Sequence, residues 1–364
     1  MEHKGINLEE VKRNNRAAIL MELNRNGAMS RKNIAEAIGL TQAGVSIIVS
    51  EMLEEGILLE LGELKEEEKR AGRKKILVDI NAFYRYVLCV GIESETTYVS
   101  IVNVVGEVQA SAEIATDRSM PAEGFLKMIC DRFKEMLWDC GLSKDKVLSV
   151  GVSLPGEVDV KKGISIKAYH VWDYPVEVRS IFERELGIET HVENNVRAYA
   201  VTEILFGSGK NGGDIFLLKW GPGVGSAIII DNKLYTGADG KAGEIGHIIA
   251  KKDGKLCSCG SRGCLETEVS SHAMREALGD ENLINDKINS FALAIRNAIR
   301  YINPNRIVMV GCLFDNEAYK TKFIEAYKTY DPHVNDDFFT TSELAAKKNH
   351  TEALAVVLNS RFHR

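Results

Sequence analysis

The chain has 364 residues, of which 45% are hydrophobic and 27% charged, and it carries a formal net charge of −6. This length exceeds what one hydrophobic core usually organises, so two or three domains are expected. The negative charge argues against nonspecific nucleic-acid binding by the whole chain. The first residues lack the apolar core of a signal peptide, and the apolar runs are too short to span a bilayer. We therefore expect a cytoplasmic protein with no membrane partner.

The N-terminal part of the chain predicts three helices. Apolar residues recur at helical spacing from Val11 to Leu23, and Gly27 is suited to end that helix. Ser30 and Thr41 are good N-cap residues for a second and a third helix. Two helices joined by a short glycine-containing turn are typical of a helix-turn-helix.

A β-hairpin is predicted to follow these helices. Residues 57–61 and 76–80 alternate between apolar and polar side chains, as strands do. Three helices and a hairpin together predict a winged helix-turn-helix DNA-binding domain over residues 1–82. The alternative is a set of three helices used for protein contacts.

The outward side chains of the third helix are small or polar, which suits a helix lying in the major groove of DNA. Gln42 can pair with an adenine edge, and Ala43 can contact a thymine methyl group. Gly44 allows close approach of the backbone. Arg73, beside a glycine in the wing, is suited to a minor groove or to phosphates. The expected DNA contacts come from Arg31, Thr41, Gln42, Ala43, Gly44, Ser46, Arg73 and Lys74.

Charge is unevenly distributed over this domain. Residues 11–50 hold six basic and two acidic residues, whereas residues 51–68 hold eight glutamates and one lysine. Since phosphates repel carboxylates, the acidic segment is expected to face away from DNA. The wing tip returns to a basic run over residues 69–75.

From residue 86 the pattern changes to alternating strands and helices. Two successive α/β lobes with a cleft between them fit this order, over residues 83–195 and 196–364, and the C-terminal helix is expected to complete the first lobe. Strands are predicted over 87–92, 98–104, 107–115, 147–153, 190–193, 216–219, 227–230, 233–235 and 307–311, and helices over 122–140, 196–205, 291–302 and 351–359.

A cysteine-rich segment indicates a metal site. Cys257, Cys259 and Cys264 are spaced by two and five residues, and His247 lies ten residues before the first. Three thiols and an imidazole are the ligands of a closed tetrahedral zinc site, and the absence of an open position predicts a structural ion. The alternative is a loose loop with buried thiols. A disulfide framework fits less well because the other four cysteines are scattered.

Four segments together resemble the ROK family of repressors, open reading frames and sugar kinases. They are Val192–Asn195, the glycine-rich turn Gly221–Gly225, Ala242–His247 and Cys257–Glu266. The resemblance covers almost the whole chain. It implies an α/β protein with a winged helix-turn-helix followed by a two-lobed, actin-like sugar-kinase fold, and a zinc ion on His247 and the three cysteines. It also implies a sugar site lined by Asn194, Asn195, Glu244, His247 and Glu266.

The sequence departs from the kinases of this family at three places. Their Asp-x-Gly-Gly-Thr phosphate loop reads Gly91–Thr96 here, with no glycine pair and with two carboxylates that would repel a triphosphate. Asn195 stands at the position of their catalytic aspartate, and an amide cannot accept the hydroxyl proton. Their Gly-Gly pair beside adenosine reads Gly311-Cys312. We therefore expect no catalytic residue, although Asn195 can still bind a sugar hydroxyl.

These observations predict a sugar-responsive transcriptional regulator, with repression as the expected direction. Its partners would be operator DNA and a monosaccharide effector, and its form a homodimer or a dimer of dimers. A sugar kinase with a DNA-binding head is the alternative from the enzyme class. A zinc sensor is a third, weakened because four closed protein ligands bind too tightly for regulation. Trp172 could stack on a sugar, but a core position is favoured.

Overall fold

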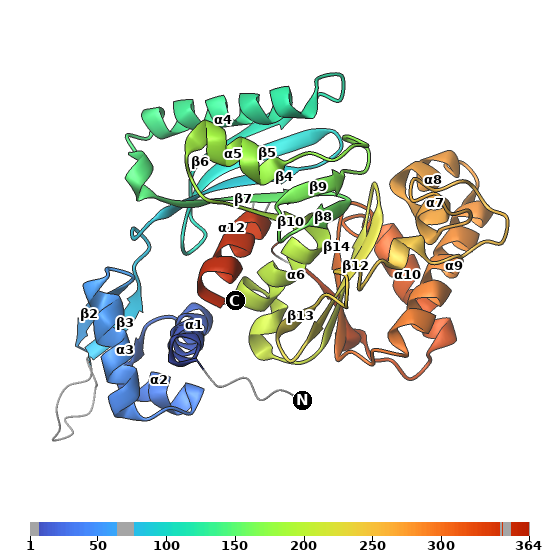
Figure 1. Cartoon of the computed structure of the whole chain (residues 1–364). Coiled ribbons are helices and arrows are strands. Elements are labelled where there is room, and N and C mark those ends of the chain that lie inside the picture. Colours follow the sequence, from blue (N-terminus) through green and yellow to red (C-terminus); the bar gives the residue numbers. More distant parts are fainter. Residues whose placement is uncertain (1–6, 64–75, 343, 345–350, 364) are drawn as a thin grey trace. The chain divides into compact units, whose positions relative to one another are not determined.

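The computed structural model describes residues 7–63, 76–342, 344 and 351–363. It divides the chain into two compact units. The first holds the described residues up to Lys167, then Tyr174–Glu193 and the described C-terminal residues. The second holds Ala168–Asp173 and the described residues from Asn194 onward. Each unit is built around its own five-stranded sheet (Figure 1).

The first unit begins with the predicted three helices. Their caps are those expected from the sequence: Ser30 accepts a hydrogen bond from the backbone of Asn33, and Thr41 accepts one from Gly44. Gly39 adopts the left-handed conformation, with φ 69°, that ends the second helix. The helices are α1 Leu8–Asn26, α2 Arg31–Ile38 and α3 Gln42–Glu54.

A small antiparallel sheet completes the winged helix. The predicted hairpin strands, β2 Leu58–Glu63 and β3 Ile76–Ile80, pair with each other, and β3 also pairs with the two-residue strand β1 Met29–Ser30. Strand β1 has only two residues, which is too short for an alternating pattern to be recognised in the sequence. The domain's core is formed by buried apolar residues from all three helices and the sheet, among them Ile19, Leu23, Ile34, Val45, Val49, Met52 and Val78.

No single helix among the described residues is long and apolar enough to cross a membrane. The bent pair formed by α2 and α3 passes that test by length and composition.

The first unit also contains a five-stranded sheet in the order β10-β7-β4-β5-β6. Strand β4 runs antiparallel to β5 and parallel to β7. Helix α12 packs on β4 and β7, and α4 and α5 pack on each other (Figure 1). The elements are β4 Tyr86–Ile92, β5 Thr96–Asn103, β6 Val108–Ala115, α4 Ala122–Asp139, β7 Val147–Leu154, α5 Val178–Leu186, β10 Thr190–Asn194 and α12 Thr351–Leu358.

Close packing of α12 on this sheet depends on glycine. A Cβ atom at Gly151 of β7 would overlap the backbone carbonyl of Ala353 in α12. A Cβ at Gly91 of β4 would lie 2.9 Å from a carboxylate oxygen of Glu352. The close approach of the helix backbone therefore requires glycine at position 151, whereas at Gly91 only the flexible end of the Glu352 side chain would have to move.

The second unit has a five-stranded sheet in the order β13-β12-β11-β14-β15. Strands β11 and β12 form an antiparallel hairpin across the glycine-rich turn, and β11 runs parallel to β14. The elements are α6 Asn195–Phe206, β11 Ile215–Trp220, β12 Val224–Ile230, β13 Lys233–Tyr235, α7 Leu265–Val269, α8 Ser271–Glu276, α9 Glu281–Ile299, β14 Arg306–Val310, α10 Glu317–Tyr330 and β15 Phe339–Thr341.

Trp220 is at the centre of the core of the second unit. Its ring lies 4.8 Å from that of Phe291 and 5.2 Å from that of Phe314, and its indole nitrogen donates to the carbonyl oxygen of Val269 at 2.7 Å. A buried indole needs such an acceptor, because an unpaired polar group in the core is costly. Strand β11 is thereby fastened to helices α7 and α9.

Several elements differ from the prediction. Helix α9 begins ten residues before the predicted start, because Asp280 caps it and Ile284 and Ile288 extend its apolar face. Helices α5, α7, α8 and α10 and strand β15 were not predicted. The remaining elements are the hairpin β8 Glu157–Asp159 and β9 Ile164–Lys167, the 3-10 turns Lys144–Lys146, Ser208–Asn211, Ile245–His247 and Asp336–Phe338, and a π-helical turn Asn359–His363.

Candidate functional site

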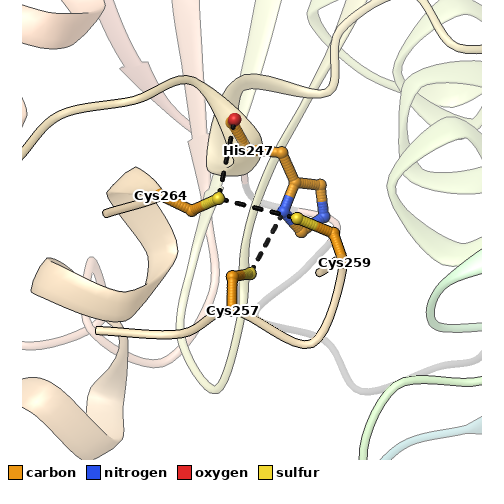
Figure 2. A group of neighbouring side chains, drawn as sticks. All are labelled: His247, Cys257, Cys259 and Cys264. Atoms are coloured by element: carbon orange, nitrogen blue, oxygen red, sulfur yellow. Dashed lines mark hydrogen bonds between the residues drawn. The ribbon is translucent and has the colours of Figure 1, made fainter. Parts of the chain in front are cut away.

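The structure brings the predicted metal ligands together in the second unit. Figure 2 shows the side chains of His247, Cys257, Cys259 and Cys264 pointing toward one another, and their ligand atoms all lie within 4.8 Å. The Sγ atom of Cys257 lies 3.6 Å from Nδ1 of His247, and the Sγ atoms of Cys259 and Cys264 are also 3.6 Å apart. The four side chains could therefore hold one metal ion.

The spacing of these atoms fits a tetrahedral ion. A separation of 3.6 Å is too long for a disulfide, whose sulfur atoms are about 2.05 Å apart. It is close to the edge, about 3.8 Å, of a tetrahedron whose metal–sulfur bonds are about 2.3 Å long. Three sulfurs and one imidazole nitrogen are a donor set suited to zinc.

The backbone of the cysteine loop is held by its own hydrogen bonds. The amide of Cys257 donates to the carbonyl of Ser261 at 2.8 Å, and Cys264 forms a β-bridge with Ile249. Gly263 has a φ of 75°, and a Cβ atom there would overlap the carbonyl oxygen of Lys251. The loop can therefore close on the ligands only with glycine at this position.

The three thiols have unequal acidities. Burial raises the pKa of Cys264 to about 12, and hydrogen bonds to Cys259 and Cys257 act in the same direction. Burial also acts to raise the pKa of Cys259, but hydrogen bonds from Ser261 and the neighbouring thiols outweigh it and lower this pKa to about 7. A metal ion would displace the remaining protons, because thiolates are the ligands that bind it.

The five residues of the predicted sugar site all belong to the second unit. Asn194 and Asn195 lie at the start of α6, Glu244 and His247 flank a 3-10 turn, and Glu266 lies in α7. Nε2 of His247 is 4.0 Å from a carboxylate oxygen of Glu244, while Nδ1 of the same ring faces the thiols. One imidazole thus joins the metal ligands to a candidate sugar-binding carboxylate.

Two of these residues also have structural contacts. A carboxylate oxygen of Glu266 accepts a hydrogen bond from the backbone of Val224 at 3.0 Å, which ties α7 to the glycine-rich turn. The side-chain oxygen of Asn194 caps α6 by accepting from the backbone of Val196 and Arg197. Both contacts fix the direction of the side chain.

The segment 168–173 contributes a residue that the sequence analysis missed. The ring of Tyr169 meets that of His247 edge-on, with centroids 5.7 Å apart and an interplanar angle of 73°. No motif marks this tyrosine, because it lies 78 positions before its partner in the chain. Trp172, by contrast, is buried, in agreement with the favoured core interpretation.

The predicted DNA-contacting residues of α3 lie on its exposed side. Thr41, Gln42 and Ala43 are exposed, and the hydroxyl of Ser46 donates to the carbonyl of Gln42 at 2.7 Å. The guanidinium of Arg31 donates to Glu60 at 2.9 Å. Gly44 is half-buried, and the last two candidates, Arg73 and Lys74, lie outside the described residues.

Ion pairs neutralise much of the basic surplus of residues 11–50. Lys12 pairs with Glu51 at 2.8 Å, and Arg16 pairs with Glu55. The glutamates at the end of α3 are therefore partners of α1, which packs beside it. The basic count over residues 11–50 consequently overstates the charge that this part of the domain offers to phosphate. These ion pairs could not be predicted from the sequence, because the two partners of each pair lie 39 positions apart.

Two family models match the chain. Residues 87–290 match the model of the ROK family, and residues 13–58 match winged helix-turn-helix DNA-binding domains. Because the first match covers more than half of the sequence, the chain belongs to the ROK family. Its fold combines a winged helix-turn-helix with the actin-like sugar-kinase fold.

Individual proteins agree with this assignment. The xylose repressor of Caldicellulosiruptor bescii is 28% identical over 305 residues, which are 83% of this chain and 74% of that protein. A ROK family transcriptional regulator, described as a homologue of the Escherichia coli Mlc protein, superposes with a TM-score of 0.78, 20% identity and 97% coverage of each chain. A ROK family glucokinase of Streptomyces griseus, solved with glucose and AMPPNP, superposes with a TM-score of 0.60 and 22% identity, over 75% of this chain and 98% of that one.

The glycines of the cysteine loop provide a test of its geometry. Gly260 and Gly263 both have positive φ, but no atom lies within 4 Å of a Cβ at Gly260. We expect Gly260→Ala to lose about 1–2 kcal/mol of stability through backbone strain. Gly263→Ala should lose about 1–3 kcal/mol more, because its methyl group also meets Lys251. Urea denaturation measures both, and equal losses would contradict the close approach at Gly263.

Proposed function

We propose that the chain is a sugar-responsive transcriptional repressor whose ROK domain binds a monosaccharide and no longer phosphorylates it. The observation that carries this proposal is one chain holding both a winged helix and a ROK domain in which a carboxylate oxygen of Glu244 lies 4.0 Å from Nε2 of His247. Such groups hydrogen-bond vicinal hydroxyls. The relatives support the regulatory role, since one is named a xylose repressor and another solved structure a transcriptional regulator.

Loss of phosphoryl transfer is supported at the end of β4. The turn between β4 and β5 is a tight hairpin, closed by the amide of Glu93 donating to the carbonyl of Thr96 at 3.1 Å. Glu93 and Glu95 flank Ser94 in this turn. The side chain of Glu352 adds a third carboxylate, which lies next to Gly91 of strand β4. Three acidic side chains at one strand end disfavour a triphosphate by charge repulsion.

The second unit carries the other two departures from the kinases. Asn195 is almost completely buried at the start of α6, and its amide cannot act as a general base. Cys312 lies beside the glycine-rich turn, with its sulfur 3.2 Å from where a Cβ at Gly221 would be. The side chain therefore occupies space that a Gly-Gly pair would leave open to a nucleotide.

We infer that the metal held by His247 and the three cysteines is a structural Zn²⁺. When bound it supplies fixed geometry, because it joins the loop 257–264 to the turn that carries His247. The same ring faces Glu244 through its other nitrogen. Ordering of the imidazole would hold that carboxylate in a defined position for a sugar.

Elemental analysis of the purified protein tests the zinc site. We expect about one zinc per chain, and a lower melting temperature after chelation, because structural zinc contributes directly to folding. Cys259→Ser should reduce the zinc content to below about half, since one of the four ligands is lost. Cys312→Ser is the matched control, because it changes another exposed cysteine outside the cluster. Equal zinc in both variants would exclude Cys259 as a ligand.

A gel-shift titration tests the sugar site. The DNA is a duplex enriched by the full chain from a randomised pool, and the sugars are pentoses, hexoses and N-acetyl amino sugars, including D-xylose and D-glucose. We expect one sugar to release the duplex. Glu244→Gln should raise the sugar concentration required by about 10–150-fold, the equivalent of losing a hydrogen bond to a charged group.

The control for this titration is Glu276→Gln, which removes an exposed carboxylate paired with Lys255. It should leave the response unchanged. A Glu244→Gln protein that responds like the wild type would remove Glu244 from the sugar site.

Regulation also requires that sugar binding be coupled to DNA binding. We propose a homodimer, or a dimer of dimers, that places two α3 helices in successive major grooves, about 34–36 Å apart. A roughly 100-fold preference of the sugar for the conformation that does not bind DNA would supply about 2.7 kcal/mol. That amount is sufficient to change operator occupancy substantially.

A sugar kinase with a DNA-binding head remains the alternative from the enzyme class, because the fold is shared with a glucokinase. A coupled ATP-hydrolysis assay over hexoses and amino sugars separates the two functions. We expect no sugar-dependent turnover, since both the phosphate loop and the general base are altered. Robust turnover with any sugar would reverse the proposal.

A further inference from the structure

The exposed side of α3 has an unusual chemical composition for a helix that reads DNA. Its sequence from Gln42 to Glu54 contains no arginine, lysine or histidine, and its two glutamates lie in the last four residues. Ile47 nevertheless exposes 63% of its surface, although isoleucine is normally buried. The side chain of Ile47 is therefore available for contact with an apolar group outside the domain.

The positions of the exposed residues form one strip along the helix. Ala43 and Ile47 are four residues apart, so their side chains lie one above the other on the same face. Gln42 and Ser50 are also exposed and flank this strip. The opposite face, with Val45, is buried in the domain core. The strip is therefore the surface that α3 offers to a major groove.

This set of side chains matches one kind of base pair. Guanine is read most often by arginine or lysine, which bind its two acceptors together, and α3 has neither. Glutamine can pair with the N6 and N7 edge of adenine, and apolar groups contact the thymine methyl group. Gln42 therefore suits adenine, while Ala43 and Ile47 suit thymine.

We propose that α3 reads A·T base pairs, with Ile47 contacting a thymine methyl group in the major groove. The proposal rests on the DNA-binding function proposed above and names the chemistry of its operator. Sequence readout by α3 is then mainly non-ionic. Attraction to phosphates must come from residues outside α3, and the pairing of Lys12, Arg16 and Arg31 with glutamates weakens the contribution of these three.

Selection of DNA by the full chain is the first test. The protein is incubated with duplexes that carry a randomised core of roughly 30 base pairs, long enough for two half-sites. We expect enrichment of half-sites with A·T pairs at the positions that Gln42→Ala and Ile47→Ala relax. Enriched G·C pairs at those positions would overturn this inference and leave the proposed function intact. Failure to enrich any sequence would overturn the proposed function together with this inference.

Replacement of thymine by uracil is the sharper test, because it removes only the methyl group. In the enriched duplex, one such replacement at the contacted position should weaken wild-type binding about fourfold, the effect of one apolar carbon. Ile47→Ala should bind the two duplexes within about twofold of each other, since the partner of the methyl group is gone. If the wild type and Ile47→Ala were equally sensitive to uracil at every thymine of the half-site, the proposed contact between Ile47 and a thymine methyl group would be overturned.

Two further variants control for indirect effects. Ile47→Val keeps a branched apolar side chain and should keep most of the sensitivity to uracil. Leu8→Ala removes a similarly exposed apolar side chain from α1, and should behave as the wild type. Because Ile47 and Leu8 are both exposed, none of these changes should lower the melting temperature by more than a few degrees.

Discussion

The imidazole of His247 is the contact on which the proposed sugar site depends. Its Nδ1 atom faces the thiols and its Nε2 atom faces Glu244, so one ring connects the metal ligands with a candidate sugar-binding carboxylate. The ring of Tyr169 meets it in a T-shaped contact, with centroids 5.7 Å apart. A ring held from several sides loses little further entropy when a ligand binds, which favours affinity. Under the proposed function, the cysteine loop would contribute to recognition by holding His247, the metal ligand that is proposed to contact the sugar.

The winged helix has ion-paired basic residues on its helices and an uncharged exposed strip on α3. Five of the basic residues in its helices are paired with glutamates, so the described part of the domain has less free positive charge than its count of basic residues indicates. Surface ion pairs of this kind add little stability. They do, however, lower the nonspecific attraction to phosphate, and under the proposal above the uncharged strip on α3 reads the bases. A repressor gains from this arrangement, because competing genomic sites bind mostly through phosphates.

The same kinase-like fold supports two kinds of protein, and side chains at a few positions distinguish them. The solved relatives include a regulator and a glucokinase, with similar architecture over the shared part. In this chain, Glu93, Glu95 and Glu352 place carboxylates at the end of β4, and we propose that Asn195 stands where the kinases have their general base. Neither change disturbs a sheet or a helix. Binding and chemistry are thus separable on one scaffold, since fold alone does not determine function.

Local features of this protein were determined by the sequence itself. The caps Ser30 and Thr41 act within one helical turn, and the cysteine spacing implies a shared ligand cluster, so short-range patterns were enough to predict them. Contacts between distant segments were decided only by the tertiary structure: Tyr169 on His247, Glu352 on Gly91, and Arg31 on Glu60. The bounds of α9 and the existence of α5 and α10 also escaped prediction. Periodicity records which face of an element is buried, but the partner that covers this face is chosen by packing of the whole chain.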